Sequence, residues 1–349
     1  MREQPNDLYF VSPIVDSLFV GVASILCFLF YRLTSSGYSG LQLDQRVILI
    51  AATLAWVGSW PHFSATAWRL YETKERVARF PLTALLLPVL FALAALACFI
   101  YPVSFAPTFL KLFILWSPWH FSLQTFGITL IYARRAGIDI SPAAKKALGL
   151  FFVSSFLVQY TEVERSMSVG FMYALFYPQL DLPAFITPLA SGAMYASLAF
   201  AGWSIFPTFR SRGLPWIFLL PILTQYLWFV HGAKVLSFQL LLPLFHGLQY
   251  LLIAWAIEIQ ARGRSLGVAR ATSRWALVNF TVGAIFFFGI PRLLAWFGFD
   301  LAFSTLVFLA AVSVHHYFVD GVIWKIREEG QRSPLFSNVR WAWQPEERR

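Results

Sequence analysis

Long apolar runs limit what this chain can fold into more than any other feature of its sequence. We count ten runs of about 20 residues, the length that a helix needs to cross a bilayer. They lie at approximately 13–34, 47–70, 82–102, 107–132, 145–162, 189–207, 215–236, 238–260, 275–298 and 301–324. The sequence therefore predicts an all-α fold, one polytopic membrane helical bundle over residues 1–349, in which 325–349 form a basic cytosolic tail.

The composition agrees with a membrane protein. Hydrophobic residues make up 58% of the chain and charged residues only 13%, whereas soluble domains carry about 25% charged residues. The net charge is +10, and the basic residues fall in short loops between the apolar runs. We therefore expect the basic residues to reflect membrane topology, and we expect no nucleic-acid partner. Cys27 and Cys98 both lie in apolar runs, and we expect no disulfide.

The basic residues are distributed unequally between the two sides of the predicted bundle. With ten spans, 21 of the 27 Lys and Arg residues fall on the side of the termini. The six on the other side are Arg32, Arg46, Lys111, Arg165, Lys234 and Arg292. Because cytosolic loops carry an excess of basic residues, we expect both termini in the cytosol. The expected location is a bacterial inner membrane.

One connection in the chain is much longer than the others, at 163–188. Its apolar middle, 169–176, is too short to cross a bilayer. We interpret this connection as an interfacial helix or a lid.

Histidines inside the predicted spans are the strongest candidates for function, since ionisable groups are rare and costly in hydrocarbon. Five of the six lie in spans that run from the outer side inward: His62, His120, His246, His315 and His316. From the next basic residue at the cytosolic end, four of them are about 10–24 Å deep along their helices. His231 lies near the outer end of a span that runs the other way, and we expect a structural or interfacial role for it.

The pair His315-His316 has an aspartate close by. Asp320 follows His316 by four residues and shares its helix face, whereas His315 is rotated by about 100°. Asp320 is expected to be a direct metal ligand or a partner that orients His316. Asp320 and Tyr317 are the candidate catalytic residues.

Two glutamines accompany the other histidines. Gln124 follows His120 by four residues, and Gln249 follows His246 by three. Both are candidate cofactor-binding residues that orient the ligand histidines. A single membrane histidine more often forms a hydrogen bond between helices than it binds a metal. For the set of five we predict a metal or haem site, with a structural or proton-relay network as the alternative.

Residue chemistry narrows the choice of metal. Imidazole suits iron, copper and zinc, and a site with few carboxylates disfavours magnesium and calcium. We predict iron, with copper, zinc and haem b as alternatives; the HExxH motif of zinc hydrolases is absent from the sequence. A redox metal inside a membrane, reached by oxygen and by apolar molecules, suggests an oxygenase-like oxidoreductase that acts on an apolar, lipid-like substrate. A redox partner is possible.

Single histidines on separate helices, next to Trp, Phe and Gly, resemble those of the Brp/Blh-type carotene dioxygenases. The resemblance covers only the local stretches around His62, His120, His246 and His315-His316. It implies an integral-membrane iron oxygenase with a four-histidine centre that cleaves a polyene, and we do not carry over that substrate. The HxxxH and HxxHH boxes of membrane desaturases do not occur in the chain. Two other functions stay open: electron transfer through haem b, and a transporter or proton pathway in which the histidines are relays.

Overall fold

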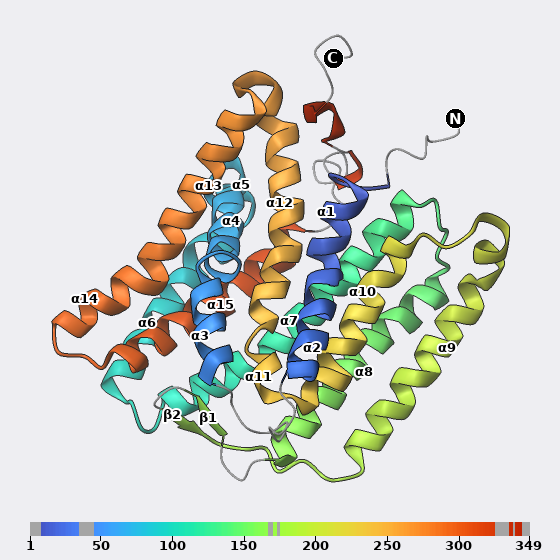
Figure 1. Ribbon diagram of the computed structural model, residues 1–349. Coiled ribbons are helices and arrows are strands. Elements are labelled where there is room, and N and C mark those ends of the chain that lie inside the picture. Colours follow the sequence, from blue (N-terminus) through green and yellow to red (C-terminus); the bar gives the residue numbers. More distant parts are fainter. Residues whose placement is uncertain are drawn as a thin grey trace.

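The computed structural model describes residues 8–34, 45–166, 170–172, 175–324, 335–337 and 339–343, which form a helical bundle (Figure 1). In the first half of the chain the elements are α1 (Pro13–Ser17), the π-helical η2 (Leu18–Val22), α2 (Ala23–Thr34), α3 (Gln45–Ala55), α4 (Ser59–Tyr71), α5 (Lys74–Arg79), the π-helical η3 (Leu82–Leu86), α6 (Leu87–Ile100), α7 (Ala106–Arg135) and α8 (Pro142–Ser166). The second half contains β1 (Gly170–Met172), β2 (Leu175–Tyr177), α9 (Ile186–Arg212), α10 (Trp216–Tyr226), η4 (Leu227–His231), η5 (Gly232–Lys234), α11 (Leu236–Gln239), α12 (Leu242–Leu266), α13 (Val268–Ala284), η6 (Ile285–Gly289), α14 (Ile290–Trp296), α15 (Leu301–Ile323) and η7 (Arg340–Trp343).

Each predicted apolar run coincides with a long helix or with consecutive helices. Within the described residues, eight of these segments are long and apolar enough to cross a membrane. They are Pro13–Thr34, Gln45–Tyr71, Leu82–Ile100, Ile186–Arg210, Trp216–Lys234, Ser237–Leu266, Val268–Trp296 and Leu301–Ile323. The structure therefore has the architecture of an integral membrane protein.

The fourth and fifth predicted spans, α7 and α8, are helices of 30 and 25 residues but are not among these eight. The reason lies in their side chains. Helix α7 buries several polar groups, including Ser122, Thr125 and Thr129, and the first turns of α8 carry Lys145 and Lys146. A helix that directs polar side chains into a bundle interior is less apolar overall than one that faces lipid.

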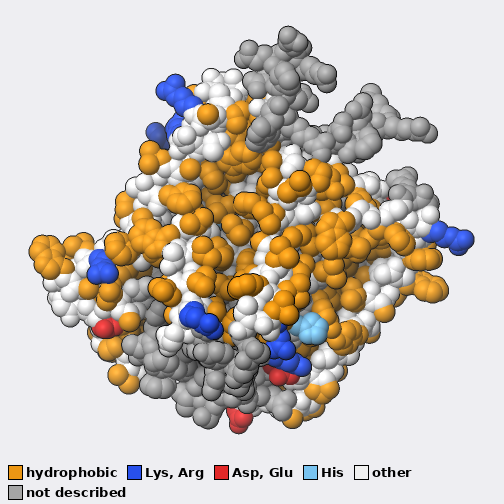
Figure 2. All heavy atoms as spheres, viewed as in Figure 1, with side chains coloured by type: hydrophobic (Ala, Val, Ile, Leu, Met, Phe, Trp, Pro, Cys, Tyr) orange, Lys and Arg blue, Asp and Glu red, His pale blue; other side chains and the backbone are white. Residues whose placement is uncertain are grey.

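The outside of the bundle is apolar. Large side chains such as Leu33, Trp203 and Leu277 are exposed. Figure 2 shows a broad apolar area across the middle of one face, with Lys, Arg, Asp and Glu side chains mainly around its margins. Exposed apolar areas of this extent mark contact with a membrane or a partner. Because eight helical segments are long and apolar enough to cross a bilayer, contact with a membrane fits this surface.

The long connection contains a β-hairpin. Strand β1 pairs antiparallel with β2, so the interfacial-helix interpretation of 169–176 is wrong for the described residues there; Val169, Tyr173 and Ala174 lie outside them. Beside the hairpin, the buried Glu164 contacts Nζ of Lys111 at 2.5 Å and accepts a hydrogen bond from the backbone N–H of Leu180. This contact attaches the connection to α7.

The first and last described segments meet at one end of the bundle. The backbone N–H of Val339 donates to the carbonyl of Phe10 at 3.0 Å. The guanidinium group of Arg135, the last residue of α7, donates to the carbonyls of Leu8 and Leu335. Most of the predicted tail at 325–349 lies outside the described residues.

Helices α4, α7, α12 and α15 pack against one another in the interior of the bundle (Figure 1). The approach of α12 to α4 is very close. A Cβ atom at Gly247 would collide with the carbonyl oxygen of Gly58 and would lie 3.2 Å from Nδ1 of His62. Glycine at 247 is therefore what lets these two helices come so near to each other.

Replacing Gly247 by Ala is expected to force α12 away from α4 and to lower the free energy of unfolding by about 1–3 kcal/mol, the usual effect of overpacking. Thermal denaturation of the purified protein measures this change. Gly127→Ala in α7 is the matched control, because an added Cβ there would meet no atom within 4 Å. Equal stability of the two variants would contradict the close-approach argument.

Candidate metal centre

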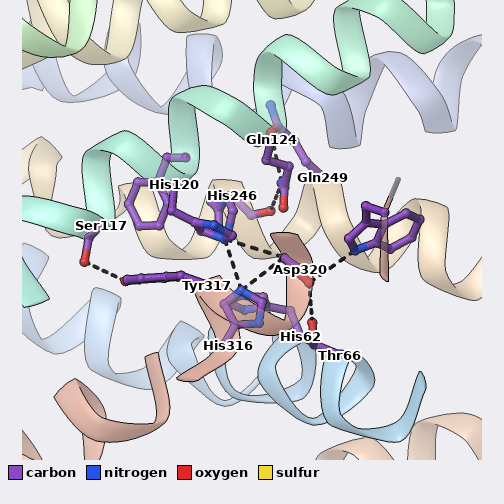
Figure 3. A network of polar contacts seen from close by, with 12 residues as sticks. His62, Thr66, Ser117, His120, Gln124, His246, Gln249, His316, Tyr317 and Asp320 are labelled. Atoms are coloured by element: carbon purple, nitrogen blue, oxygen red, sulfur yellow. Dashed lines mark hydrogen bonds and ion pairs between the residues drawn. The ribbon is translucent and has the colours of Figure 1, made fainter. Parts of the chain in front are cut away.

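Four of the predicted histidines converge in the interior, one from each of the four central helices (Figure 3). His62 comes from α4, His120 from α7, His246 from α12 and His316 from α15. Nε2 of His316 lies 3.1 Å from Nε2 of His120 and 3.3 Å from Nε2 of His62. The ring of His246 lies 4.9 Å from that of His120 and 5.1 Å from that of His62, between centroids. All four side chains are buried, and we call them the histidine cluster.

Asp320 completes the cluster with its carboxylate. Its Oδ2 lies 3.3 Å from Nε2 of His316 and 3.5 Å from Nε2 of His120. Its Oδ1 accepts hydrogen bonds from the hydroxyl of Thr66 at 3.1 Å and from Nε1–H of Trp324 at 3.2 Å. Two donors thus fix one oxygen, and the other oxygen faces the imidazoles.

The orientation of His62 follows from the start of its helix. Its Nδ1 lies 2.5 Å from the carbonyl oxygen of Ser59, three residues earlier in the first turn of α4. A carbonyl only accepts, so Nδ1 carries the hydrogen and donates it. In the neutral ring, Nε2 then directs its lone pair into the cluster. Metal-binding histidines are commonly held in this way by a backbone carbonyl on the second nitrogen.

Hydrogen bonds alone do not satisfy the cluster. One imidazole nitrogen makes a single hydrogen bond, as donor or as acceptor, yet Nε2 of His316 has three polar atoms within 3.5 Å. Both ring nitrogens of His246 are buried without a hydrogen-bond partner in the described part of the chain. Buried polar atoms are nearly always paired, so such orphans call for a missing ligand. A cation shared by the imidazoles would bind one nitrogen of each ring, including one of the two in His246.

The distances suit a metal ion. His62, His246 and His316 offer ligand atoms that all lie within 4.8 Å of one another, and His120, His316 and Asp320 form a second such group. Two nitrogens bound to one metal at about 2.0–2.1 Å, with bond angles between octahedral and tetrahedral values, are about 2.8–3.4 Å apart. The two observed nitrogen–nitrogen distances, 3.1 and 3.3 Å, fall in that interval.

His315 lies outside the cluster, which differs from its prediction as a ligand. Its Nε2 lies 3.0 Å from the carbonyl oxygen of Thr83, and its ring faces Phe91 of α6. Neighbouring residues on a helix are rotated by about 100°. Once His316 faces the cluster, His315 must therefore face α6. His231 is exposed and packs on the ring of Tyr226, in agreement with a role apart from the site.

Tyr317, a candidate catalytic residue, contacts the cluster through its ring and not through its hydroxyl. The ring stacks on that of His120, with centroids 4.4 Å apart. The hydroxyl lies 2.6 Å from Oγ of Ser117, away from Asp320 (Figure 3). The geometry gives Tyr317 a part in fixing the plane of the His120 ring.

Gln124 and Gln249 support the cluster through the backbone. Nε2 of Gln124 donates to the carbonyl of His246 at 3.0 Å. Nε2 of Gln249 donates to the carbonyl of Val20 in η2 at 2.7 Å. They therefore hold α12 in position, whereas the prediction had them orient the imidazole rings. The sequence reasoning missed Thr66 and Trp324 as partners of Asp320, although Trp324 follows Asp320 by four residues and shares its helix face.

Cavities lie on both sides of the cluster. One of about 470 Å³ borders His316 and His315 and lies between α4, α6, α15 and the continuous segment α13–η6–α14 (Val268–Trp296), which we call the α13–α14 arm. Another of about 210 Å³ reaches His120, Asp320 and Tyr317 and includes Trp116, Trp119 and Trp324 in its wall. The cluster is thus buried but accessible from two directions.

Comparisons of this chain with protein-family models, with curated proteins and with solved structures gave no match.

Replacing His316 by Ala is expected to abolish binding of the metal, because His316 belongs to both ligand groups. Elemental analysis of the purified protein gives the metal-to-protein ratio. His231→Ala is the control and is expected to keep the full ratio, since His231 is exposed and outside the cluster. A similar loss in both variants would show that the cluster does not hold the metal.

Proposed function

We propose that this protein is an integral-membrane, metal-dependent oxidoreductase of the oxygenase type, acting on an apolar lipid or isoprenoid-type substrate. The observation that carries the proposal is the buried cluster of four imidazoles and one carboxylate, which borders a large apolar cavity. A structural network needs no such cavity, and a binding protein for apolar molecules needs no unpaired imidazoles.

Iron is the metal that the donor set favours. His120, His316 and Asp320 have the composition of the two-histidine, one-carboxylate sites of non-haem iron oxygenases. His62 and His246 add two further nitrogen ligands. Iron in such a site supplies the dioxygen and one-electron chemistry that oxidation of a hydrocarbon requires. Copper and zinc remain alternatives, and a four-histidine iron centre is also what the resemblance to the Brp/Blh-type carotene dioxygenases implies.

The chain's own residues have separable tasks around this centre. Asp320 supplies negative charge and a proton-accepting oxygen beside His120 and His316. Thr66 and Trp324 prevent the carboxylate from turning away, because both donate to its other oxygen. Burial of the whole group excludes water, which strengthens each electrostatic contact and protects reactive species from side reactions.

Access of the substrate from the lipid is supported by the position of the large cavity. Leu96 of α6 and Phe286 of η6 both line it, and both are exposed on the apolar surface. A hydrocarbon chain in the bilayer is thus able to reach the cavity between α6 and the α13–α14 arm without passing through water. A soluble substrate would gain nothing from an opening there.

The haem b alternative is disfavoured by the spacing of the imidazoles. Two axial histidines need a porphyrin plane between them, with metal–nitrogen bonds of about 2 Å on each side. Here the Nε2 atoms of His316 and His120 are only 3.1 Å apart, and the other imidazoles surround the same space. An intense Soret band in the visible spectrum of the purified protein would support haem.

A proton relay needs hydrogen bonds that continue from the cluster to both surfaces. In the described residues, Asp320 accepts side-chain hydrogen bonds from Thr66 and Trp324. Metal bound at one ion per protein would favour the oxidoreductase over this alternative, because a relay uses the histidines with free ring nitrogens.

For the topology we propose ten spans with both termini in the cytosol of a bacterial cell, which places the protein in the inner membrane. The basic side of the bundle would then face any redox partner. This proposal includes α7 and α8 as spans, since both are long enough and α7 carries His120. The meeting of the first and last described segments supports an even number.

Reporter fusions test the topology. A fusion after Arg349 is expected to report the cytosol, and a reporter inserted in the 163–188 connection is expected to report the opposite side. The physical reason is the excess of basic residues on the side of the termini. The ten-span proposal has five spans between the connection and Arg349. If both reporters give the same side, the number of spans between them is even and the proposal is wrong.

Asp320→Asn tests the role of the carboxylate. The amide keeps the shape and accepts the hydrogen bonds from Thr66 and Trp324, but it removes the charge beside the imidazoles. We expect metal affinity to fall by at least about 10-fold while the protein stays folded, measured by competition with a chelator. Asp300→Asn is the matched control on the same helix, because Asp300 caps the start of α15 and Asn caps equally well. Unchanged affinity in Asp320→Asn would restrict Asp320 to a structural role.

A further inference from the structure

The large cavity beside the cluster has a wall that is almost wholly apolar. Phe63, Phe91, Phe99 and Phe286 contribute rings to it, together with aliphatic side chains of α6 and α15. Its volume of about 470 Å³ is within the range of small-molecule sites. Specificity in such a site depends on the few polar groups in the wall.

His315 is one of these polar groups, and a proline explains how it is held. Within the π-helical turn η3, the N–H of Leu87 bonds to the carbonyl of Leu82. The carbonyl of Thr83 would next require the N–H of residue 88, but Pro88 has none. Nε2 of His315 lies 3.0 Å from this unpaired carbonyl. The carbonyl only accepts, so Nε2–H of His315 donates, and in the neutral ring Nδ1 is left as an acceptor.

Nδ1 of His315 has no hydrogen-bond partner in the described part of the chain, and the side chain is only half-buried. Nδ1 of His316 also has no partner in the described part of the chain, but that atom is fully buried. Because His315 lines the cavity, its ring brings an accepting nitrogen into the wall next to the cluster.

The hydroxyl groups in the same wall have already used their hydrogens. Ser64 donates to the carbonyl of Trp60, and Tyr71 donates to the carbonyl of Ala84. Thr66 donates to Asp320. No lysine or arginine is among the described residues that line the cavity. The described side chains in the wall thus present acceptors and no free donors, which suits a hydrogen-bond donor and disfavours an ester or an ether, since these groups only accept.

We propose that the large cavity binds a hydrocarbon chain carrying a hydroxyl group, and that this hydroxyl donates its hydrogen to Nδ1 of His315. His315 would then be a positioning residue. Because His316 is the next residue on α15 and borders the same cavity, the carbon atoms near the hydroxyl come to lie beside the cluster. This inference rests on the proposed function in taking the occupant of the cavity as the substrate.

Competition binding tests the proposal in phosphatidylcholine nanodiscs that contain the full chain. The probe is radiolabelled 1-hexadecanol, displaced by unlabelled 1-hexadecanol, by methyl hexadecyl ether or by hexadecane at equal mole fractions in the bilayer. The ether accepts hydrogen bonds but cannot donate one. We expect the wild-type protein to prefer the alcohol to both competitors by about 3- to 10-fold, the effect of one hydrogen bond.

His315→Phe is expected to remove this preference and to keep the wild-type metal content. His315→Gln retains an accepting oxygen and is expected to keep part of the preference. His231→Phe is the matched control, since His231 is exposed and does not line the cavity; it is expected to behave as the wild type.

Four results would overturn the inference. Three concern binding: equal displacement by alcohol and ether in the wild type, a full preference in His315→Phe, or a Gln variant that behaves like the Phe variant. The fourth is loss of metal in His315→Phe, which would make His315 a ligand. A wild-type protein that prefers the alcohol but binds no metal would contradict the proposed function alone. Metal without any preference for the alcohol would contradict this inference alone.

Discussion

The structure depends on one constraint: polar groups in a bundle surrounded by lipid must find their partners inside the protein. Four imidazoles and a carboxylate meet where α4, α7, α12 and α15 come together. All five side chains are buried there, so an unpaired nitrogen or a lone carboxylate costs far more than it would at a surface. The close approach of Gly247 to Gly58 and the carbonyl of Ser59 on His62 both serve to bring the imidazoles into mutual contact. In the proposed function, a cation would bind one nitrogen of each imidazole and so supply the partner that these rings share.

Irregular turns of the helices provide backbone partners for some of these polar side chains. The π-helical segments η2 and η3 each offer a backbone carbonyl to a side chain from another helix: Val20 accepts from Gln249, and Thr83 is bonded to His315. A wider turn changes the usual pairing of backbone groups, and π-bulges occur frequently at functional sites. In this protein they fix the rotation of α12 and α15 and so the direction of the histidines that these helices carry. Pro88 adds to this effect by removing a competing N–H.

The cluster also separates two cavities of different character. The larger one is apolar and adjoins exposed side chains of α6 and η6, so it suits a hydrocarbon that arrives from the bilayer. The smaller one borders His120, Asp320 and Tyr317 and contains three tryptophans. Under the proposed function, a lipid substrate and a second reactant would reach opposite sides of the same centre without sharing a path. This separation would keep the hydrocarbon side dry during the proposed oxidation.

The sequence alone determined the helical membrane architecture, because runs of apolar residues of bilayer length have few other stable structures. It also predicted that His62, His120, His246 and His316 lie in one band, about 10–24 Å from the cytosolic ends of their helices, since the rise per residue is fixed, and it put Asp320 on the face of His316. Only the tertiary structure decided that His315 turns to α6, that Gln124 and Gln249 hold backbone carbonyls, that 170–177 contain a hairpin, and where the cavities lie. The reason is that helices such as α15 are apolar on nearly every side, so their sequence periodicity carries little information about rotation. Packing against α4, α6 and α7 sets that rotation, and with it which of two adjacent histidines enters the cluster.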